Sequence, residues 1–330
     1  MEFSYKKAGV DIDAGEKAVK NIKEMVKSTF SKNVLTNIGG FGGCYSFNFK
    51  EYNEPVLVSS ADGVGTKLIV ANMANRHNTI GQCLINHCVN DILATGAKPL
   101  FFLDYIGTGK LEQKTFFDII SGLSKACREN ECSLIGGETA EMPGIYQSKD
   151  YDLVGTIIGI VEREHMLPDG VKKGDVLIGL KSSGLHTNGY SLARNVLFEK
   201  HDVNDFIDEI GSTLADALLK VHRSYLKLIS PLLRKSGLHA ISHITGGGII
   251  GNTQRVVPKN LTLKVNWNSW EWLPIFKYIQ KLGKINDTEM GRVFNLGIGL
   301  ILVVSYDCVV EFRRILQNQG EESIIIGEIE

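Results

Sequence analysis

The sequence has almost no net charge, because 36 Lys and Arg residues stand against 37 Asp and Glu residues in a chain of 330. Nucleic acids and anionic membranes attract proteins with excess positive charge, and this chain has no such excess. A long hydrophobic run is also missing: the longest, around Leu296 to Val304, is too short to cross a bilayer. The first residues lack the apolar core of a signal peptide. We therefore expect no nucleic-acid partner, no membrane partner and a cytoplasmic location.

Cysteines are few as well, and the six present form no disulfide framework in a chain of this length. Two pairs, Cys83 with Cys88 and Cys127 with Cys132, each enclose four residues, a spacing that invites a zinc interpretation. No second ligand pair lies nearby in the sequence, so buried thiols are favoured. Apolar residues make up 43% and charged residues 22% of the chain, which is typical of a globular protein long enough for two domains.

The pattern of apolar residues predicts a mixed α and β domain in the first half of the chain. The predicted strands are 55–61, 99–106, 132–136 and 152–162, and the predicted helices are 78–95 and 112–130. Turn residues then cluster at Pro168-Asp169-Gly170. We place the domain boundary there, with an N-terminal domain of residues 1–168 and a C-terminal domain of residues 169–330.

The C-terminal domain also combines both kinds of element. Its predicted strands lie near 175–180, 238–244, 261–265, 296–304 and 322–327, and its predicted helices near 189–200, 212–235 and 249–256.

A turn with unusual chemistry, Asp62-Gly63-Val64-Gly65-Thr66-Lys67, follows the apolar run 55–61. It combines a carboxylate, two glycines, a hydroxyl and an ammonium, which are the groups that a Mg²⁺-polyphosphate site needs. The order of residues is not that of a P-loop, in which Gly and Lys precede the Ser or Thr. A turn in which Asp62 only caps the following helix is the alternative interpretation.

Helix 78–95 presents His87, Asn90 and Asp91 on one side, since residues three and four apart are neighbours on a helix. Two residues are too few to make His87 and Asp91 a metal pair on their own. We expect His87 to be a packed or surface side chain. Asp91 is either a cap-like residue or a Mg²⁺ ligand.

Glu138 follows the glycine pair Gly136-Gly137 at the end of a predicted strand. Glycines allow a ligand to approach the backbone closely, and carboxylates beside such a place often hold Mg²⁺ on phosphates. The alternative is a solvated acidic turn. Because Asp62 and Asp91 also lie at element ends, we expect the three carboxylates to share one hard-cation site.

Two segments of the C-terminal domain follow predicted strands and open helices. Ser182 to Ser191 contains Ser183, His186 and Asn188, and the imidazole of His186 suits proton transfer near neutral pH. The loop Thr245-Gly246-Gly247-Gly248 leaves backbone N–H groups free to face an anion such as a phosphomonoester. Taken singly, each pattern is also common in ordinary caps and turns.

Together these motifs resemble the phosphoribosylformylglycinamidine cyclo-ligases, also called aminoimidazole ribonucleotide synthetases. The resemblance covers nearly the whole chain. It rests on Tyr5 to Gly15, Gly39 to Gly42, Asp62 to Lys67, Cys88 to Asp91, Pro99 to Tyr105, Gly136 to Pro143, Ser182 to Leu192, His243 to Gly248 and Phe294 to Gly299. The motif at Asp62 alone would indicate only the wider ATP-dependent superfamily.

The resemblance implies an α+β fold of two domains. The mixed sheet of the N-terminal domain would pair across a homodimer into a barrel, and the C-terminal domain would be an α/β sandwich. ATP and substrate would lie in a cleft between the domains. The implied reaction converts formylglycinamidine ribonucleotide and ATP into aminoimidazole ribonucleotide, ADP and phosphate in purine biosynthesis, with Mg²⁺ as the second cofactor.

The resemblance also implies roles for single residues. Mg²⁺ would be held by Asp62, Asp91 and Glu138. The catalytic residues would be Asp62, Lys67, which neutralises phosphate charge, and His186, which handles a proton or steadies the phosphorylated intermediate. The nucleotide would be contacted by Lys23, Gly39, Gly40, Gly63, Gly65, Thr66, Lys67, Asn90 and Asp104. The substrate would be contacted by Ser183, Asn188, Thr245, Gly246, Gly247 and Gly248.

Other members of the superfamily remain as alternatives. Selenophosphate synthetase calls for a reactive Cys or selenocysteine near the N-terminus, whereas the earliest cysteine here is Cys44. An enzyme similar to thiamine-phosphate kinase is a second alternative. A non-catalytic nucleotide-binding scaffold, a third, would be expected to have lost some of the acidic residues, and all of them are present.

Overall fold

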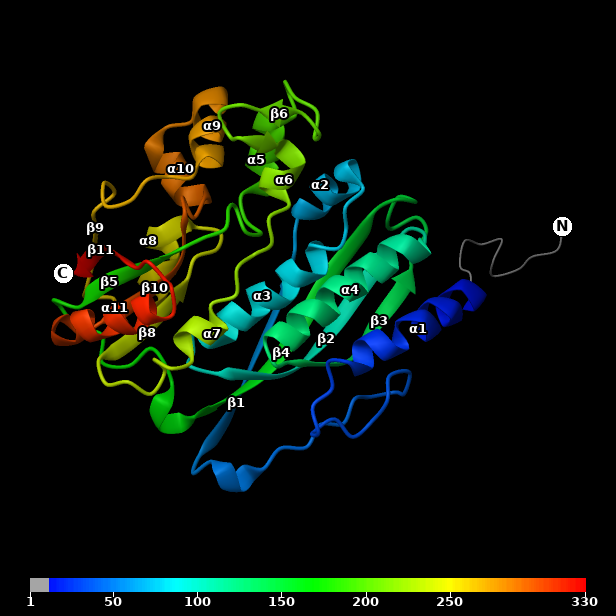
Figure 1. Cartoon of the computed structure of the whole chain (residues 1–330), viewed down its shortest axis with the longest axis horizontal. Helices are drawn as coiled ribbons and strands as arrows, with labels where there is room; N and C mark the ends of the chain where they lie inside the picture. Colours follow the sequence, from blue (N-terminus) through cyan, green and yellow to red (C-terminus); the bar gives the residue numbers. More distant parts are fainter. Residues whose placement is uncertain (1–11) are drawn as a thin grey trace.

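Two larger sheets, one in each half of the chain, organise the fold of the computed structural model, and β6 and β7 form a small third sheet (Figure 1). The structure describes residues 12–330, so most of the Tyr5 to Gly15 segment lies outside the described residues. The elements of the N-terminal half are α1 (Ile12–Lys27), β1 (Pro55–Gly63), α2 (Lys67–Ala74), α3 (Ile80–Leu93), β2 (Lys98–Thr108), α4 (Gln113–Glu129), β3 (Ser133–Glu141) and β4 (Tyr151–Glu162).

The N-terminal sheet is mixed, as predicted, with the strand order β1-β4-β2-β3. Only β2 and β3 are parallel, and α4 makes the crossover that a parallel pair needs. Helices α3 and α4 cover one face of this sheet, and α1 lies beside α4 (Figure 1). Strand β4 alternates between more and less buried residues, which fits a sheet covered on one face.

Helices α3 and α4 approach each other closely because both carry a glycine at the contact. A Cβ on Gly81 would lie 2.3 Å from the Ile119 carbonyl oxygen, and one on Gly122 would lie 2.5 Å from the Asn78 carbonyl oxygen. Backbone therefore packs against backbone at this crossing.

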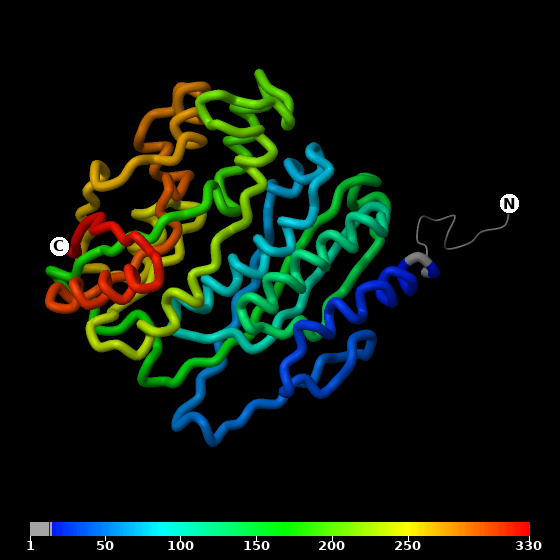
Figure 2. The backbone as a smooth tube through the Cα atoms, in the orientation of Figure 1, coloured from blue at the N-terminus to red at the C-terminus, as the bar shows by residue number. Residues whose placement is uncertain are grey.

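Helix α3 is buried on almost every side, with Asp91 as its one less buried residue. The sheet and α4 cover part of it, and the segment Lys220–Tyr225 from the C-terminal half runs along the rest (Figure 2). Asn86 donates to the His222 carbonyl oxygen over 2.7 Å, and Asn90 donates to the Arg223 carbonyl oxygen over 2.8 Å. The two halves of the chain thus meet along one helix.

The C-terminal half is built on a second sheet with the order β8-β10-β5-β11-β9, in which all neighbours are antiparallel. Strand β10, which lies between β8 and β5, is buried along its whole length. The elements are β5 (Val176–Lys181), α5 (Tyr190–Leu197), β6 (Phe206–Ile207), β7 (Ser212–Thr213), α6 (Leu214–Leu218), α7 (Leu226–Ile229), β8 (Leu238–His243), α8 (Gly248–Thr253), β9 (Leu263–Val265), α9 (Pro274–Gly283), α10 (Asp287–Val293), β10 (Ile298–Val304), α11 (Val309–Asn318) and β11 (Ile324–Ile329).

The two-domain mixed α and β prediction is confirmed, while the boundary after residue 168 stays a prediction. The long helix predicted at 212–235 is wrong, because only the short helices α6 and α7 form there. Between them the chain gives backbone groups to side chains of α3 instead of to a helical ladder. In the part of the chain that the structure describes, no helix is both long and apolar enough to cross a membrane.

Candidate functional site

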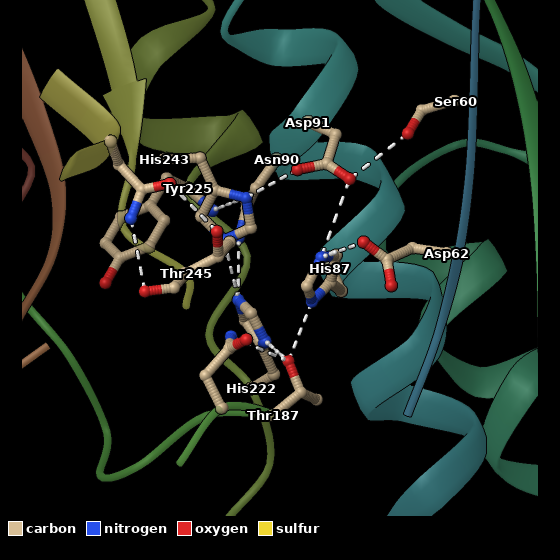
Figure 3. Close-up of polar contacts among 12 residues, drawn as sticks. Ser60, Asp62, His87, Asn90, Asp91, Thr187, His222, Tyr225, His243 and Thr245 are labelled. Carbon is tan, nitrogen blue, oxygen red and sulfur yellow. Dashed lines mark hydrogen bonds and ion pairs between the residues drawn. The ribbon is translucent and has the colours of Figure 1, made fainter. Parts of the chain in front are cut away.

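His87 is the centre of a polar cluster where the two halves of the chain meet (Figure 3). Its Nε2 lies 2.8 Å from Asp62 Oδ2 and 3.6 Å from Asp91 Oδ2. Asp62 comes from the end of β1, whereas His87 and Asp91 lie one turn apart on α3. His87 is 3% exposed, so of the two positions expected for it, packed or surface, the structure has the packed one, with carboxylates as its neighbours.

Two more histidines from the C-terminal half extend the cluster (Figure 3). His243, the last residue of β8, places Nδ1 2.8 Å from Asp91 Oδ1, and its Nε2 lies 3.0 Å from His222 Nε2. Thr187 Oγ1 lies 2.7 Å from His87 Nδ1 and 3.3 Å from His222 Nδ1. The polar contacts therefore form a closed ring, which we call the histidine ring: His87, Asp91, His243, His222 and Thr187.

Charge in the histidine ring is concentrated on the side that faces Asp62. Burial lowers the pKa of His87, but the hydrogen bond to Asp62 and the charges of Asp91 and Asp62 outweigh it and leave the pKa raised. Burial raises the pKa of Asp62 and of Asp91, yet their histidine partners leave both pKa values lowered. Burial holds the pKa of His222 well below its usual range. A cationic His87 between two carboxylates is thus the favoured state at neutral pH, next to neutral imidazoles.

Lys67 does not face an open phosphate site as the sequence had suggested, and this corrects the expectation. Its ammonium is fully buried, donating to the carbonyl oxygens of His186 (2.9 Å) and Lys220 (2.6 Å) and contacting Cys83 Sγ (3.2 Å). Burial lowers its pKa. Because both carbonyls belong to the C-terminal half, Lys67 at the start of α2 links the two halves.

His186 is buried beside the histidine ring, where its side chain stacks on His222 with ring centroids 4.0 Å apart. Burial holds its pKa well below the usual range, so the ring is neutral. Its Nε2 accepts from the Ser183 backbone N–H over 3.2 Å, so the proton sits on Nδ1. Within residues 12–330 that Nδ1 has no hydrogen-bond partner. A buried donor without an acceptor is costly, which favours a role toward a bound ligand.

A separate cavity of about 850 Å³ lies between α1, the glycine-rich loop Gly39–Gly43 and the β2–β3 edge of the N-terminal sheet. Four predicted site residues line it: Gly39, Gly40, Asp104 and Glu138. Burial raises the pKa of the Asp104 carboxyl to about 7. The volume lies in the range of small-molecule sites.

Glu138 does not join Asp62 and Asp91 within one chain. It pairs with Tyr105, which pairs with Val154 and so with Gly63, the neighbour of Asp62. Three strand spacings separate the two positions, about 14 Å. The expected site of three shared carboxylates is therefore wrong for one chain: Asp62 and Asp91 converge, and Glu138 lies at the cavity.

The other predicted nucleotide residues surround the Asp62 turn or lie apart from it. Gly65 supplies a positive φ of 61° to the turn, and Thr66 Oγ1 lies 3.2 Å from Ser191 Oγ across the two halves. Asn90 is fully buried and holds the Arg223 carbonyl oxygen and the Tyr225 N–H. Gly63, within the turn, is the last residue of β1. Lys23 is exposed on α1 and does not line the cavity.

The predicted substrate residues form one loop region. Asn188 and the loop Thr245–Gly248 are neighbours, because a Cβ on Gly246 would lie 3.4 Å from Asn188 Oδ1. Asn252 fixes this loop by donating to the Gly248 carbonyl oxygen over 2.8 Å. Gly247 and Gly248 take positive φ angles of 101° and 64° as α8 begins. Ser183 instead donates to the Val221 carbonyl oxygen over 2.6 Å.

Models of two protein families match the chain. The N-terminal domain of AIR synthase related proteins matches residues 45–161, and the C-terminal domain of the same proteins matches residues 172–330. Proteins named phosphoribosylformylglycinamidine cyclo-ligase are similar over almost the full length. The one from Alkaliphilus oremlandii is 48% identical over 100% of this chain and 97% of its own, and that from Thermodesulfovibrio yellowstonii is 49% identical over 99% and 96%.

The chain belongs to the phosphoribosylformylglycinamidine cyclo-ligase family. The resemblance drawn from its motifs is thereby confirmed.

Solved structures share the fold of this cyclo-ligase family member at low identity. Thiamine-monophosphate kinase from Stenotrophomonas maltophilia has a TM-score of 0.70 at 16% identity, covering 94% of this chain and 93% of its own. The hydrogenase maturation protein HypE in complex with ATP has a TM-score of 0.69 at 14% identity, covering 98% and 88%. At such identities the likeness establishes the fold alone.

Sequence reasoning missed three residues of the histidine ring. His222 lies in a segment predicted to be helical, and nothing around it in the sequence marks it as functional. Thr187 and His243 belong to quoted motifs but were not singled out. His243 ends β8 and Thr187 lies in the loop between β5 and α5, and this position at an element end, beside other site residues, was the signal that could have found them.

Proposed function

We propose that this chain catalyses ATP-dependent ring closure of formylglycinamidine ribonucleotide to aminoimidazole ribonucleotide, with release of ADP and phosphate. The formyl oxygen of formylglycinamidine ribonucleotide is a poor leaving group. Transfer of the γ-phosphoryl group of ATP to that oxygen gives an iminophosphate and ADP. The ribose-bearing nitrogen then attacks the formyl carbon, the C–O bond breaks, and phosphate departs as the ring closes.

The observation that carries the proposal is the convergence of Asp62 and Asp91 around one imidazole at the junction of the two halves. Their lowered pKa values keep both carboxylates ionised, and carboxylate oxygens are the ligands that Mg²⁺ prefers. These residues fit Mg²⁺ and are the two that we propose as its ligands. Mg²⁺ bound there neutralises charge on the transferring phosphoryl group.

His186 is the residue that we propose for the intermediate. Its neutral ring carries an unpaired Nδ1–H, which can donate to an oxygen of the iminophosphate. Lys67 acts at one remove: by holding the His186 carbonyl oxygen it positions that backbone. This differs from the phosphate contact implied by the resemblance and follows from the burial of the ammonium.

The substrate phosphate is proposed to bind at the loop Thr245–Gly248. Gly247 precedes α8, so the backbone N–H groups of the first turn lack helical partners and suit a phosphate. Asn188 lies against this loop and is proposed to orient the amidine. Gly39, Gly40 and Asp104 in the 850 Å³ cavity are proposed to contact the nucleotide.

A homodimer is proposed as the working assembly. The sheet face opposite α3 and α4 is apolar at several positions, and Leu57 on β1 is 60% exposed. A second copy of the chain would cover this face and join the two sheets into a barrel.

The experiment is to incubate the protein with ATP, Mg²⁺ and formylglycinamidine ribonucleotide and to detect the aminoimidazole by its diazotisation colour. We expect coloured product and ADP in equal amounts. Asp62→Asn should lower turnover at saturating Mg²⁺ by at least about a hundredfold. His186→Gln should slow ring closure in a single turnover by a similar factor.

His239→Gln is the matched control, because His239 also pairs with an aspartate, Asp175, but lies outside the site. It should retain turnover. ATP cleavage without coloured product would instead favour another phosphoryl-transfer reaction of the superfamily. Full turnover by Asp62→Asn would contradict the assignment of Asp62 as a Mg²⁺ ligand.

A further inference from the structure

We propose that a second cavity in the N-terminal half of the chain binds a sugar phosphate. This cavity has a volume of about 350 Å³ and lies between α2, the first turns of α4, the end of β2 and the β3–β4 loop. Of its lining residues, Leu111 and Phe116 also line the 850 Å³ cavity, and none belongs to the histidine ring or to the loop Thr245–Gly248. The site is therefore separate from those proposed for the nucleotide, the metal and the substrate phosphate.

The floor of the cavity carries a hydrogen-bond donor that lacks an acceptor. His77 Nδ1 lies 2.9 Å from the Tyr151 hydroxyl, and the two residues are 5% and 7% exposed. Burial lowers the pKa of His77 and raises the pKa of Tyr151, so both groups are neutral near pH 7. A neutral pair holds two polar hydrogens, and the contact uses one of them. Among residues 12–330 the two side chains hydrogen-bond only to each other, so the second hydrogen is left for a ligand.

Positive charge gathers at the rim of the same cavity. Lys110, in the loop before α4, and Lys149, in the β3–β4 loop, are exposed and line it. Helix α4, of 17 residues, also begins there, and its N-cap Glu112 makes no side-chain hydrogen bond to the free N–H groups of the first turn. Two ammonium groups and a helix N-terminus attract a phosphate. Glu112 is the one carboxylate among the lining residues, so it offsets only part of this charge.

The two loops that carry these lysines are fixed against each other. Thr108 Oγ1 lies 3.0 Å from the Lys110 carbonyl oxygen and 3.1 Å from the Asp150 carbonyl oxygen. A Cβ on Gly109 would lie 2.0 Å from the Gln147 carbonyl oxygen, so backbone packs against backbone between the loops. The rim is thus preorganised, which lowers the entropy cost of binding a ligand.

The size and the remaining lining of the cavity indicate a ligand larger than a phosphate ion. A volume of about 350 Å³ lies in the range of sites for small organic molecules. Asn72, Asn75 and Thr115 offer amide and hydroxyl groups for sugar hydroxyls, and Ile106 and Phe116 offer an apolar wall. A sugar phosphate combines an anionic group for the lysines with hydroxyls for the amides.

The test is lysine footprinting of the full-length protein without ATP, Mg²⁺ or substrate. N-hydroxysuccinimide acetate labels exposed amines, and mass spectrometry measures the labelling rate at each lysine. The probe is methyl riboside 5-phosphate, which has no aldehyde that reacts with amines. At about ten times its Kd it should slow the labelling of Lys110 and Lys149 about tenfold, because bound chains are protected by mass action. Lys114 is exposed in the first turn of α4 but does not line the cavity, so its labelling should not change.

Variants test the rim and the floor separately. Lys110→Gln should raise the probe concentration that half-protects Lys149 at least about fivefold, because it removes a hydrogen bond to a charged group. Lys149→Gln should do the same for Lys110. The double variant His77→Phe with Tyr151→Phe removes both polar hydrogens of the floor while keeping both rings, and should raise the half-protecting concentration for both lysines at least about fivefold.

Lys114→Gln is the matched control and should bind the probe as the wild type does. Circular dichroism checks that each variant folds. Lysine labelling does not report on the loop Thr245–Gly248, which contains no lysine, so the result is independent of the proposed substrate site.

Three outcomes would overturn the site. One is wild-type labelling of Lys110 and Lys149 that stays unchanged at millimolar concentrations of the probe; this decides the question even if the double variant does not fold. Another is equal slowing at Lys114, which would show an unspecific attraction of anions to lysines. The third is half-protection by inorganic phosphate at the same concentration as by the sugar phosphate, which would mean that the cavity does not recognise the sugar.

Discussion

At the scale of single residues, Lys67 shows that surroundings decide what a charged side chain does. In the sequence it closes a turn rich in phosphate-binding groups, yet in the structure its ammonium donates to two carbonyl oxygens from the other half of the chain. A buried ammonium is stable only when such acceptors replace water. The residue is therefore a link between the halves, and its effect on the site passes through the His186 backbone.

Replacing this link by an apolar side chain of similar length tests the role. Lys67→Met leaves the carbonyl oxygens of His186 and Lys220 without their donor and relieves the buried charge, so we expect a net loss of about 1–3 kcal/mol in the free energy of unfolding. Urea denaturation measures it. The KM for ATP should change less than about threefold; a large rise in KM with unchanged stability would instead place the ammonium on phosphate.

Asp104 makes stability depend on pH in an unusual direction. Burial raises its pKa to about 7 in the folded chain, above the roughly 3.9 of an exposed aspartate. Folding thus favours the neutral Asp104 carboxyl. The contribution of this carboxyl to the free energy of unfolding is fully present below about pH 4 and is lost as pH rises to about 7. Asp104→Asn should show a smaller fall in unfolding free energy between pH 5 and pH 8.

Urea midpoints across that range measure the effect. Asp307→Asn, which removes an exposed carboxylate on the C-terminal half, controls for the change in net charge. Parallel pH curves for wild type and Asp104→Asn would contradict the assignment.

Sequence reasoning identified Asp62 and Asp91 because carboxylates at the ends of predicted elements are a local pattern. It could not find His222, whose place depends on an extended segment lying along α3. Nor could it place Glu138, since strand order decides that β3 lies three positions from β1. Local sequence patterns therefore predicted which residues lie at the ends of elements. Contacts between segments distant in the sequence decide which of those residues meet.

At the scale of elements, the predicted strands of both sheets form because alternating or continuous apolar runs suit a covered sheet. The helix expected at 212–235 fails for a physical reason: α3 offers Asn86 and Asn90 as partners for backbone groups of Lys220–Tyr225. An extended segment uses those partners, and a helix would bond internally instead. Helical periodicity in a sequence does not report such an outside partner.

The crossing of α3 and α4 gives a prediction for one glycine. A helix interior gains about 1 kcal/mol when Ala replaces Gly, but the Cβ of Gly122→Ala would lie 2.5 Å from the Asn78 carbonyl oxygen. Separating two packed backbones costs about 1–3 kcal/mol. We expect a net loss of up to about 2 kcal/mol in the free energy of unfolding, measured by thermal or urea denaturation.

Gly15→Ala on α1 is the matched control, since its Cβ would meet nothing within 4 Å. In the absence of ligand, Gly15→Ala should raise the free energy of unfolding by about 0.5–1 kcal/mol. Equal gains in both variants would show that the two helices are not in backbone contact.

At the scale of the whole molecule, the uncovered sheet face predicts self-association. Leu57→Lys places a charge on the β1 side of this face, which is tolerated by a free surface and disfavoured in a buried interface. Sedimentation should show dimers for the wild type and monomers for Leu57→Lys. Val310→Lys, which changes an 80% exposed valine on α11, should remain dimeric. A monomeric wild type, or a dimeric Leu57→Lys, would contradict the barrel.

The buried ammonium of Lys67 also makes it possible to measure how often the two halves of the chain separate. Acylating reagents attack unprotonated amines that they can reach, and this amine is enclosed until the two halves part. The rate at which mass spectrometry finds Lys67 labelled, set against the rate for the exposed Lys23, therefore reads the frequency with which the junction opens.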